Sequence, residues 1–177
     1  RIKKTPSYVG RYLDSVFDII LNILFMITIC YVAQTKLWMT LIAFFCIQLQ
    51  GTLYNYYYVI LRNKSVGGDK TSKIFENKSP EALPGENKKW VNIWFGIYTI
   101  VYGIFDKIIH ILDSDAYKVN TFPNWFMTIV SLYGLGFQLL IIAVMLTFGW
   151  IEMIVPFFIF YSILIFVLIG IRKVYFK

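Results

Sequence analysis

YLDSVFDIILNILFMITICYVA, residues 12–33, is long enough to cross a bilayer as a single helix. The hydrocarbon core of a membrane needs about 20 apolar residues in helical conformation. The run is continuously apolar rather than alternating, which favours a helix over a strand. Its only charged residues are Asp14 and Asp18, both near its start. The run therefore predicts a membrane helix with two carboxylates at one end.

The rest of the chain has the same character. Hydrophobic residues make up 58% of the 177 residues and aromatic residues 19%, which is far above the usage of soluble domains. Apolar runs recur at 15–33, 37–61, 90–112, 125–148 and 150–171. We therefore expect an all-α polytopic membrane protein, with residues 1–177 forming a single membrane domain.

The basic residues predict how these helices thread the membrane. Residues 62–89 hold seven of the 17 Lys and Arg residues, which marks them as a cytoplasmic loop. If the run 90–112 spans, the basic tail falls outside. If it lies along or dips into the inner face, every basic residue except Lys36 is inside. The second arrangement is favoured, giving four spanning helices plus one interfacial or re-entrant helix. The net charge of +7 thus reflects topology, not nucleic-acid binding.

A polar stripe runs along the start of the first apolar run. Gly10, Asp14, Asp18 and Asn22 are spaced four residues apart, so they share one slowly turning helix face. Arg11 precedes Asp14 by three residues and could neutralise it, but that would leave Asp18 unexplained. Carboxylates in membrane segments are costly unless paired, hydrated or bound to metal. Two adjacent carboxylates suit a hard divalent cation such as Mg²⁺, Mn²⁺ or Ca²⁺.

The spacing of this stripe resembles a family signature. Arg1, eight residues, then Gly10-x-x-x-Asp14-x-x-x-Asp18 is similar to the second half of the CDP-alcohol phosphatidyltransferase motif. That motif reads Asp-x-x-Asp-Gly-x-x-Ala-Arg, eight residues, Gly-x-x-x-Asp-x-x-x-Asp. The resemblance implies that the chain is the remainder of a six-helix bundle. We expect the N-terminal helices, and the first two motif aspartates, upstream of Arg1.

The resemblance also implies an activity, of EC 2.7.8 type. Members of the family transfer a phosphoalcohol, such as a phosphatidyl group, from a CDP-activated donor to an alcohol acceptor in phospholipid synthesis and release CMP. A two-metal site of Mg²⁺ or Mn²⁺ is expected, incomplete in this chain. By position in the motif, Asp14 is a metal ligand, and Asp18 is the catalytic base and also a metal ligand. Arg1 would contact the donor phosphates, and Gly10 would allow close approach of the nucleotide or a helix.

Partners and location follow from the same resemblance. We expect membrane lipid, a CDP-activated donor and an alcohol acceptor as partners, with no nucleic acid; a homodimer stays open. The location is expected to be the cell inner membrane, with the active site facing the cytoplasm. The alternative is a non-enzymatic scaffold or small transporter with an intramembrane Asp pair.

Three other patterns are interpreted as structural rather than functional. Asp106 and Lys107 are expected to form a local solvated or interfacial pair. Arg172 is interpreted as a positively charged anchor at an inner helix end. The aromatic run YNYYYV, residues 54–59, is typical of a belt at the membrane surface.

Overall fold

The structure, a computed structural model, describes residues 6–64, 76 and 78–176. Every regular element within these ranges is a helix, and none is a strand, which confirms the all-α prediction. The elements are α1 (Tyr8–Ala33), α2 (Leu37–Lys64), α3 (Lys88–Val101), α4 (Gly103–Leu112), the 3-10 helix η1 (Ser114–Lys118), α5 (Asn124–Ser131), α6 (Leu135–Thr147), α7 (Ile151–Tyr161) and α8 (Ile163–Tyr175).

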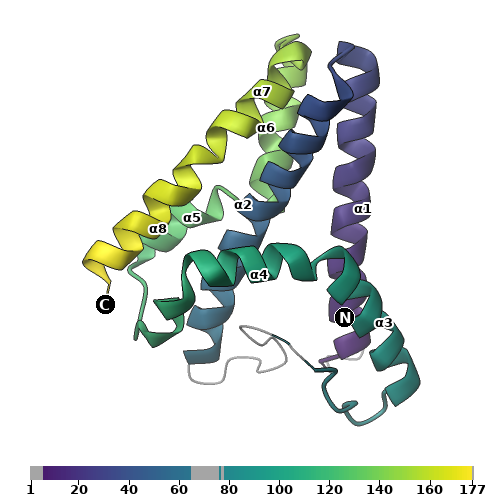
Figure 1. The fold of residues 1–177 in the computed structure, drawn as a ribbon, viewed down its shortest axis with the longest axis vertical. Helices are drawn as coiled ribbons and strands as arrows, with labels where there is room; N and C mark the ends of the chain where they lie inside the picture. Colours follow the sequence, from purple (N-terminus) through teal and green to yellow (C-terminus); the bar gives the residue numbers. More distant parts are fainter. Residues whose placement is uncertain (1–5, 65–75, 77, 177) are drawn as a thin grey trace.

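Helices α1 and α2 form an antiparallel hairpin (Figure 1). Ser7 caps the start of α1, because its Oγ accepts a hydrogen bond from the Gly10 amide at 3.0 Å. The helix ends where Gln34 adopts a left-handed conformation with a φ of 49°. A short turn then sends α2 back along α1, so the start of α1 and the end of α2 lie at the same end of the molecule.

Helices α3 and α4 lie across that end (Figure 1), and we call them the crossing helices. They cover the apolar run 90–112, but they are not one straight helix, since their axes differ by 60° at a break at Tyr102. Tyr102 is both the C-cap residue of α3 and the N-cap residue of α4. The break allows the segment to turn over the open end of the α1–α2 hairpin.

Several helices are long and apolar enough to cross a membrane. Among the described residues these are α1, α2 and the 25-residue segment Ile151–Tyr175 that α7 and α8 form together. The run 125–148 is a second bent pair, α5 with α6, whose axes differ by 51°. Counting each bent pair as one span raises the number from three to five. This number fits a membrane protein.

The bundle has two main hydrophobic cores. The core at the crossing end joins α2, η1, α5 and α8 and contains the fully buried Tyr57, Phe126 and Tyr133. The core at the other end packs Met26, Ile154 and Phe158 between α1, α2, α6 and α7. Large apolar side chains also cover the outer faces of the long helices, where a soluble bundle would carry polar ones. Lipid would cover such faces.

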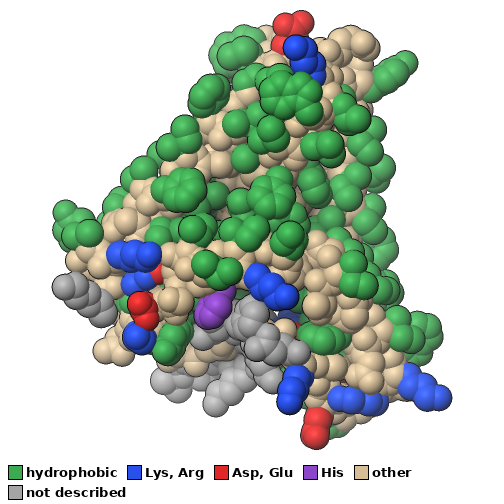
Figure 2. All heavy atoms as spheres, in the orientation of Figure 1, with side chains coloured by type: hydrophobic (Ala, Val, Ile, Leu, Met, Phe, Trp, Pro, Cys, Tyr) green, Lys and Arg blue, Asp and Glu red, His purple; other side chains and the backbone are tan. Residues whose placement is uncertain are grey.

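Charged side chains are concentrated at one end. Figure 2 shows most Lys, Arg, Asp, Glu and His side chains at the end that the crossing helices cover, below a broad hydrophobic band. At the other end, the charged residues of the two turns are Lys36, before α2, and Glu152, in the first turn of α7. This distribution is typical of a membrane protein whose two surfaces differ in charge.

The loop before α3 is fastened to the start of α1. Glu86 accepts hydrogen bonds from the Ser7 hydroxyl at 2.7 Å, the Val9 amide at 3.0 Å and the Leu83 amide at 3.3 Å. Partial burial raises the pKa of Glu86, but these hydrogen bonds lower it by more, so the pKa lies below its ordinary value of 4.5. A carboxylate at a helix N-terminus is also favoured by the helix dipole. Glu86 thus helps to hold α3 beside α1.

Candidate functional site

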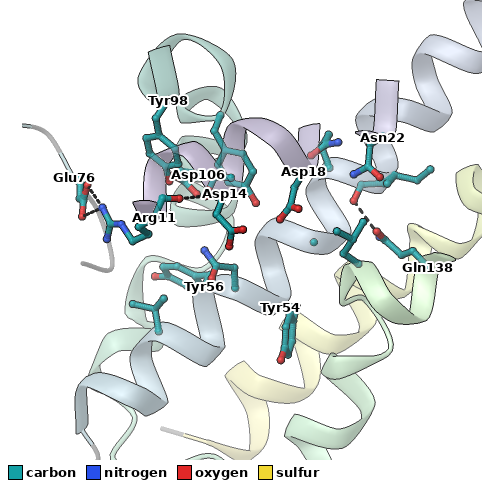
Figure 3. Close-up of a pocket in the computed structure, with 18 of the residues that line it drawn as sticks. Arg11, Asp14, Asp18, Asn22, Tyr54, Tyr56, Glu76, Tyr98, Asp106 and Gln138 are labelled. Carbon is teal, nitrogen blue, oxygen red and sulfur yellow. Dashed lines mark hydrogen bonds and ion pairs between the residues drawn. The ribbon is translucent and has the colours of Figure 1, made fainter. Parts of the chain in front are cut away.

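A cavity of about 330 Å³ lies between α1, α2, α6 and the crossing helices. We call it the polar cavity, because most of the side chains that line it are polar or charged. Asp14, Asp18 and Asn22 of α1 all line it (Figure 3). The stripe expected from the four-residue spacing is therefore present, and it faces a space large enough for a small ligand.

Asp14 and Asp18 are neighbours one helical turn apart. Asp14 is exposed and Asp18 half-buried, and each lies within electrostatic reach of the other. Within the described part of the chain, neither carboxylate has an ion-pair partner. Like charges at this spacing repel, so the pair would be stabilised by a bound cation.

The suggested neutralisation of Asp14 by Arg11 is wrong, because Arg11 is engaged elsewhere. Its guanidinium nitrogen lies 2.6 Å from both carboxylate oxygens of Glu76. The Tyr12 hydroxyl donates to the same carboxylate at 2.6 Å. Glu76 is distant in sequence and lies in the loop after α2, so no helical spacing could have indicated this pair.

The crossing helices bring a third aspartate to the cavity. Asp106 of α4 lines it together with Tyr98 and Tyr102, and the Tyr98 hydroxyl donates to Asp106 at 2.5 Å (Figure 3). The expected local pair of Asp106 with Lys107 is therefore wrong: Asp106 is partly buried at the cavity, and Lys107 is exposed. One signal was present in the sequence, since residues 98, 102 and 106 repeat the four-residue spacing of 14, 18 and 22.

Gln138 of α6 lines the cavity and is hydrogen-bonded to Gln50 of α2. Gln138 donates to the Ile47 carbonyl at 3.2 Å and to the Gln50 side chain at 3.1 Å. Gln50 in turn donates to the Phe158 carbonyl at 3.1 Å and to the Ser162 hydroxyl at 2.7 Å. This glutamine network ties α2, α6 and α7 together, and both glutamines are buried.

Gln48 differs from these two glutamines. It lines the cavity and is only 4% exposed, but its amide nitrogen has no hydrogen-bond partner among the described residues. Buried polar groups are normally paired, and leaving one unpaired costs about 1–3 kcal/mol. The neighbouring Thr52 hydroxyl donates to the Gln48 carbonyl at 2.7 Å and to the Tyr102 hydroxyl at 3.1 Å. The backbone at Gln48 is thus fixed, and its side-chain amide is left unpartnered.

The aromatic run of α2 is only partly a surface belt. Tyr54 and Tyr56 line the cavity, and Tyr56 and Tyr57 are 5% and 0% exposed. Only Tyr58 of this group is largely exposed. A helix places successive residues on different faces, so one run supplies the cavity wall, the protein core and the outer surface.

A second buried carboxylate lies outside the cavity and is paired with an arginine. Asp113 accepts hydrogen bonds from the Tyr57 hydroxyl at 2.7 Å and from Arg172 Nε at 2.8 Å, and Arg172 Nη2 contacts the same carboxylate. We call these three residues the paired cluster. Arg172 is 4% exposed, so its interpretation as an anchor at the membrane surface is wrong. It joins α8 to the end of α4.

Two residues implied by the motif are not seen at the cavity. Arg1 lies outside the described residues. Gly10 is exposed in the first turn of α1 and does not line the cavity, and a Cβ there would lie 3.3 Å from the Ser7 hydroxyl. Their proposed contacts with a nucleotide stay predictions.

The oxygen donors that α1 brings to the cavity are two carboxylates and one amide. No group of three or more His, Cys, Asp or Glu side chains within the described ranges is arranged to hold a metal ion. Asp14 and Asp18 nevertheless provide two unpaired carboxylates, with the Asn22 amide on the same face, and these oxygen donors suit Mg²⁺ or Mn²⁺. The donor set fits a divalent ion whose shell is completed by further ligands.

Comparison of the chain with known proteins identifies no relative. No protein-family model matches the chain, and no curated protein or solved structure matches it.

Proposed function

We propose that the chain is the membrane domain of a CDP-alcohol phosphotransferase, which moves a phosphoalcohol from a CDP-activated donor to an alcohol and releases CMP. One observation carries the proposal. The two aspartates of Gly10-x-x-x-Asp14-x-x-x-Asp18 share one helix face, line one cavity and have no ion-pair partner among the described residues. Unpaired carboxylates at a membrane-helix end are functional residues by default.

Asp14 and Asp18 would hold Mg²⁺ or Mn²⁺ together with ligands that the family places upstream. When bound, the metal ions neutralise the negative charge of the pyrophosphate. Asp18 lies deeper along the stripe and accepts the proton of the attacking hydroxyl if that hydroxyl comes within hydrogen-bond reach. Arg1 and Gly10 keep the roles that the motif gives them, at the donor phosphates and at the nucleotide.

The position of the cavity suits a reaction between a lipid and a water-soluble substrate. We propose four spanning segments, α1, α2, α5 with α6, and α7 with α8, and place the crossing helices at the inner face. The cavity is lined by the crossing helices, which lie at the charged end of the bundle that Figure 2 shows, so both substrates would reach it there. The positive-inside rule would orient this end toward the cytoplasm.

Release of CMP tests the proposal. Full-length protein with Mg²⁺ or Mn²⁺ should release CMP from a CDP-alcohol and an acceptor, and Asp18→Asn should abolish the release. Asp115→Asn is the matched control, because Asp115 is an exposed carboxylate of η1 paired with Lys118 at 2.6 Å. Release in the Asp18 variant would reject the base assignment. No release by the native protein with any donor and acceptor would reject the transferase and favour the transporter or scaffold.

The parent gene offers a second test without any assay. The codons before Arg1 should encode Asp-x-x-Asp-Gly-x-x-Ala. If these two aspartates are missing there, the metal shell cannot be completed as the family requires, and the proposal fails.

A further inference from the structure

The polar cavity is lined by polar groups besides the Asp14–Asp18 pair. Asp106 and Tyr98 line the cavity from the crossing helices, where Figure 3 shows them. Gln48 lines it from α2. These residues lie outside the motif that indicates the phosphotransferase. The proposed metal binding and proton transfer assign no role to Asp106, Tyr98 or Gln48.

Asp106 is held in place as a hydrogen-bond acceptor. The Tyr98 hydroxyl occupies one carboxylate oxygen, Oδ2, at 2.5 Å. No ion pair with Asp106 occurs in the described ranges, and the nearby Arg11 is bound to Glu76. A partly buried carboxylate with one oxygen fixed and the other unclaimed by a cation is suited to accept a hydrogen bond from a ligand.

Gln48 is the independent sign that a ligand belongs here. Gln48 is only 4% exposed, and its side-chain amide nitrogen has no hydrogen-bond partner within the described residues. A core built only for stability would have an apolar residue at this position, because an unpaired amide is destabilising. A ligand oxygen in the cavity would supply the missing acceptor.

The two groups line the same cavity as Asp18. Tyr102 lines this cavity too, and its hydroxyl lies 3.1 Å from the Thr52 hydroxyl, which donates to the Gln48 carbonyl at 2.7 Å. A small molecule that touches Asp18 can therefore extend toward Asp106 and Gln48.

We propose that Asp106 and Gln48 form a subsite for a water-soluble acceptor alcohol that carries a second hydrogen-bond donor besides its reacting hydroxyl. This inference rests on the proposed function. The reacting hydroxyl faces Asp18, the second donor group binds Asp106, and an oxygen of the alcohol accepts from Gln48. The second donor is either another hydroxyl, as in a polyol, or an ammonium group, as in an amino alcohol; both suit a carboxylate acceptor.

Thermal unfolding of the full-length protein in detergent tests the subsite without requiring turnover. Inositol represents the polyols, ethanolamine the amino alcohols, and ethanol an alcohol without a second donor. Native protein should be stabilised by inositol or by ethanolamine, but not by ethanol, and the one that acts identifies the donor group. Asp106→Asn should remove the stabilisation, and Asp115→Asn should retain it.

Gln48→Met gives a result that a purely structural role would not produce. Methionine matches glutamine in shape and removes the unpaired amide, so this variant should unfold at a higher temperature and yet be stabilised less by the alcohol. In CMP release, Asp106→Asn should raise the KM for the acceptor about tenfold or more, with kcat and the KM for the CDP donor nearly unchanged.

Three results would overturn the subsite. They are equal stabilisation of native protein and Asp106→Asn, no stabilisation by inositol or ethanolamine, and a KM effect on the donor instead of the acceptor. Failure of the proposed function gives a different result, because the native protein then binds the alcohol but releases no CMP.

Discussion

The paired cluster and the polar cavity both contain carboxylates of the helical bundle, but these carboxylates differ in whether a described residue pairs with them. Asp113 is fully buried, accepts a hydrogen bond from Tyr57 and forms an ion pair with Arg172. Asp14 and Asp18 line a cavity and have no ion-pair partner in the described ranges. A buried charge with partners holds helices together, whereas an unpaired charge at a cavity is available for a ligand. The difference separates a carboxylate that joins helices from a pair of carboxylates that is open to a ligand.

The largest expected effect falls on activity and comes from the cavity. Asp14→Asn should reduce CMP release by about 10³–10⁴-fold, roughly 4–5.5 kcal/mol of activation free energy, because a metal ligand is lost. The free energy of unfolding should stay the same or rise, since repulsion from Asp18 disappears. Thermal unfolding and CMP release measured on the same sample check both parts. A strong loss of stability would make Asp14 structural, like Asp113.

Removing one partner from the paired cluster should instead affect stability. Arg172→Leu should lower the free energy of unfolding by about 3–5 kcal/mol, because Asp113 would be left buried and unpaired. Lys173→Leu is the control, since Lys173 is exposed and its ammonium group donates to the Leu112 carbonyl at 2.8 Å. The double replacement of Asp113 and Arg172 by leucine should recover much of the loss. Equal effects at positions 172 and 173 would contradict the pairing.

The two glutamines of α2 sharpen the comparison. Gln50→Leu should lower the free energy of unfolding by about 1–3 kcal/mol, because it removes a hydrogen-bond partner of Gln138 and the donor to Ser162. Gln48→Met should have the opposite sign, since its amide has no described partner. Denaturant unfolding of both variants is the measurement. If both substitutions change the free energy of unfolding in the same direction, burial alone, and not hydrogen bonding, determines how these two residues affect stability.

The smallest expected effect concerns Glu86, at the surface. Its pKa is lower in the folded protein than its ordinary value, so its contribution to stability is present above that value and is lost as the pH falls through the folded pKa. Screening of this partly exposed group limits the contribution to about 0.5 kcal/mol. Glu86→Gln should be less stable than native protein at pH 7, and the difference should vanish by about pH 3. A constant difference across this range would contradict the ionic role.

The regular features of the molecule could be predicted from local patterns. Apolar runs gave the helices, and the spacing of Asp14 and Asp18 placed them on one face, because both depend only on helical periodicity. The breaks within the runs 90–112 and 125–148 were missed. They occur at Tyr102 and near Gly134, where neither a charged residue nor a proline interrupts the run.

The partners of charged residues could not be predicted. Arg11 binds Glu76 and Arg172 binds Asp113, pairs separated by 65 and 59 residues. Local spacing favours neighbours such as Asp14 for Arg11 and Lys107 for Asp106, but tertiary packing decides which side chains meet. The unpaired amide of Gln48 is likewise visible only when all surrounding acceptors are placed.

The glutamine network has a consequence for how the protein is made. Gln50 and Ser162 are 112 residues apart, so at synthesis rates of about 5–20 residues per second the partner leaves the ribosome roughly 6–22 s after Gln50. During that interval the amide of Gln50 would enter lipid unpaired, which is costly. Helix α2 therefore settles in its final position only after α6 and α7 have been synthesised, and the cavity is completed late in membrane insertion.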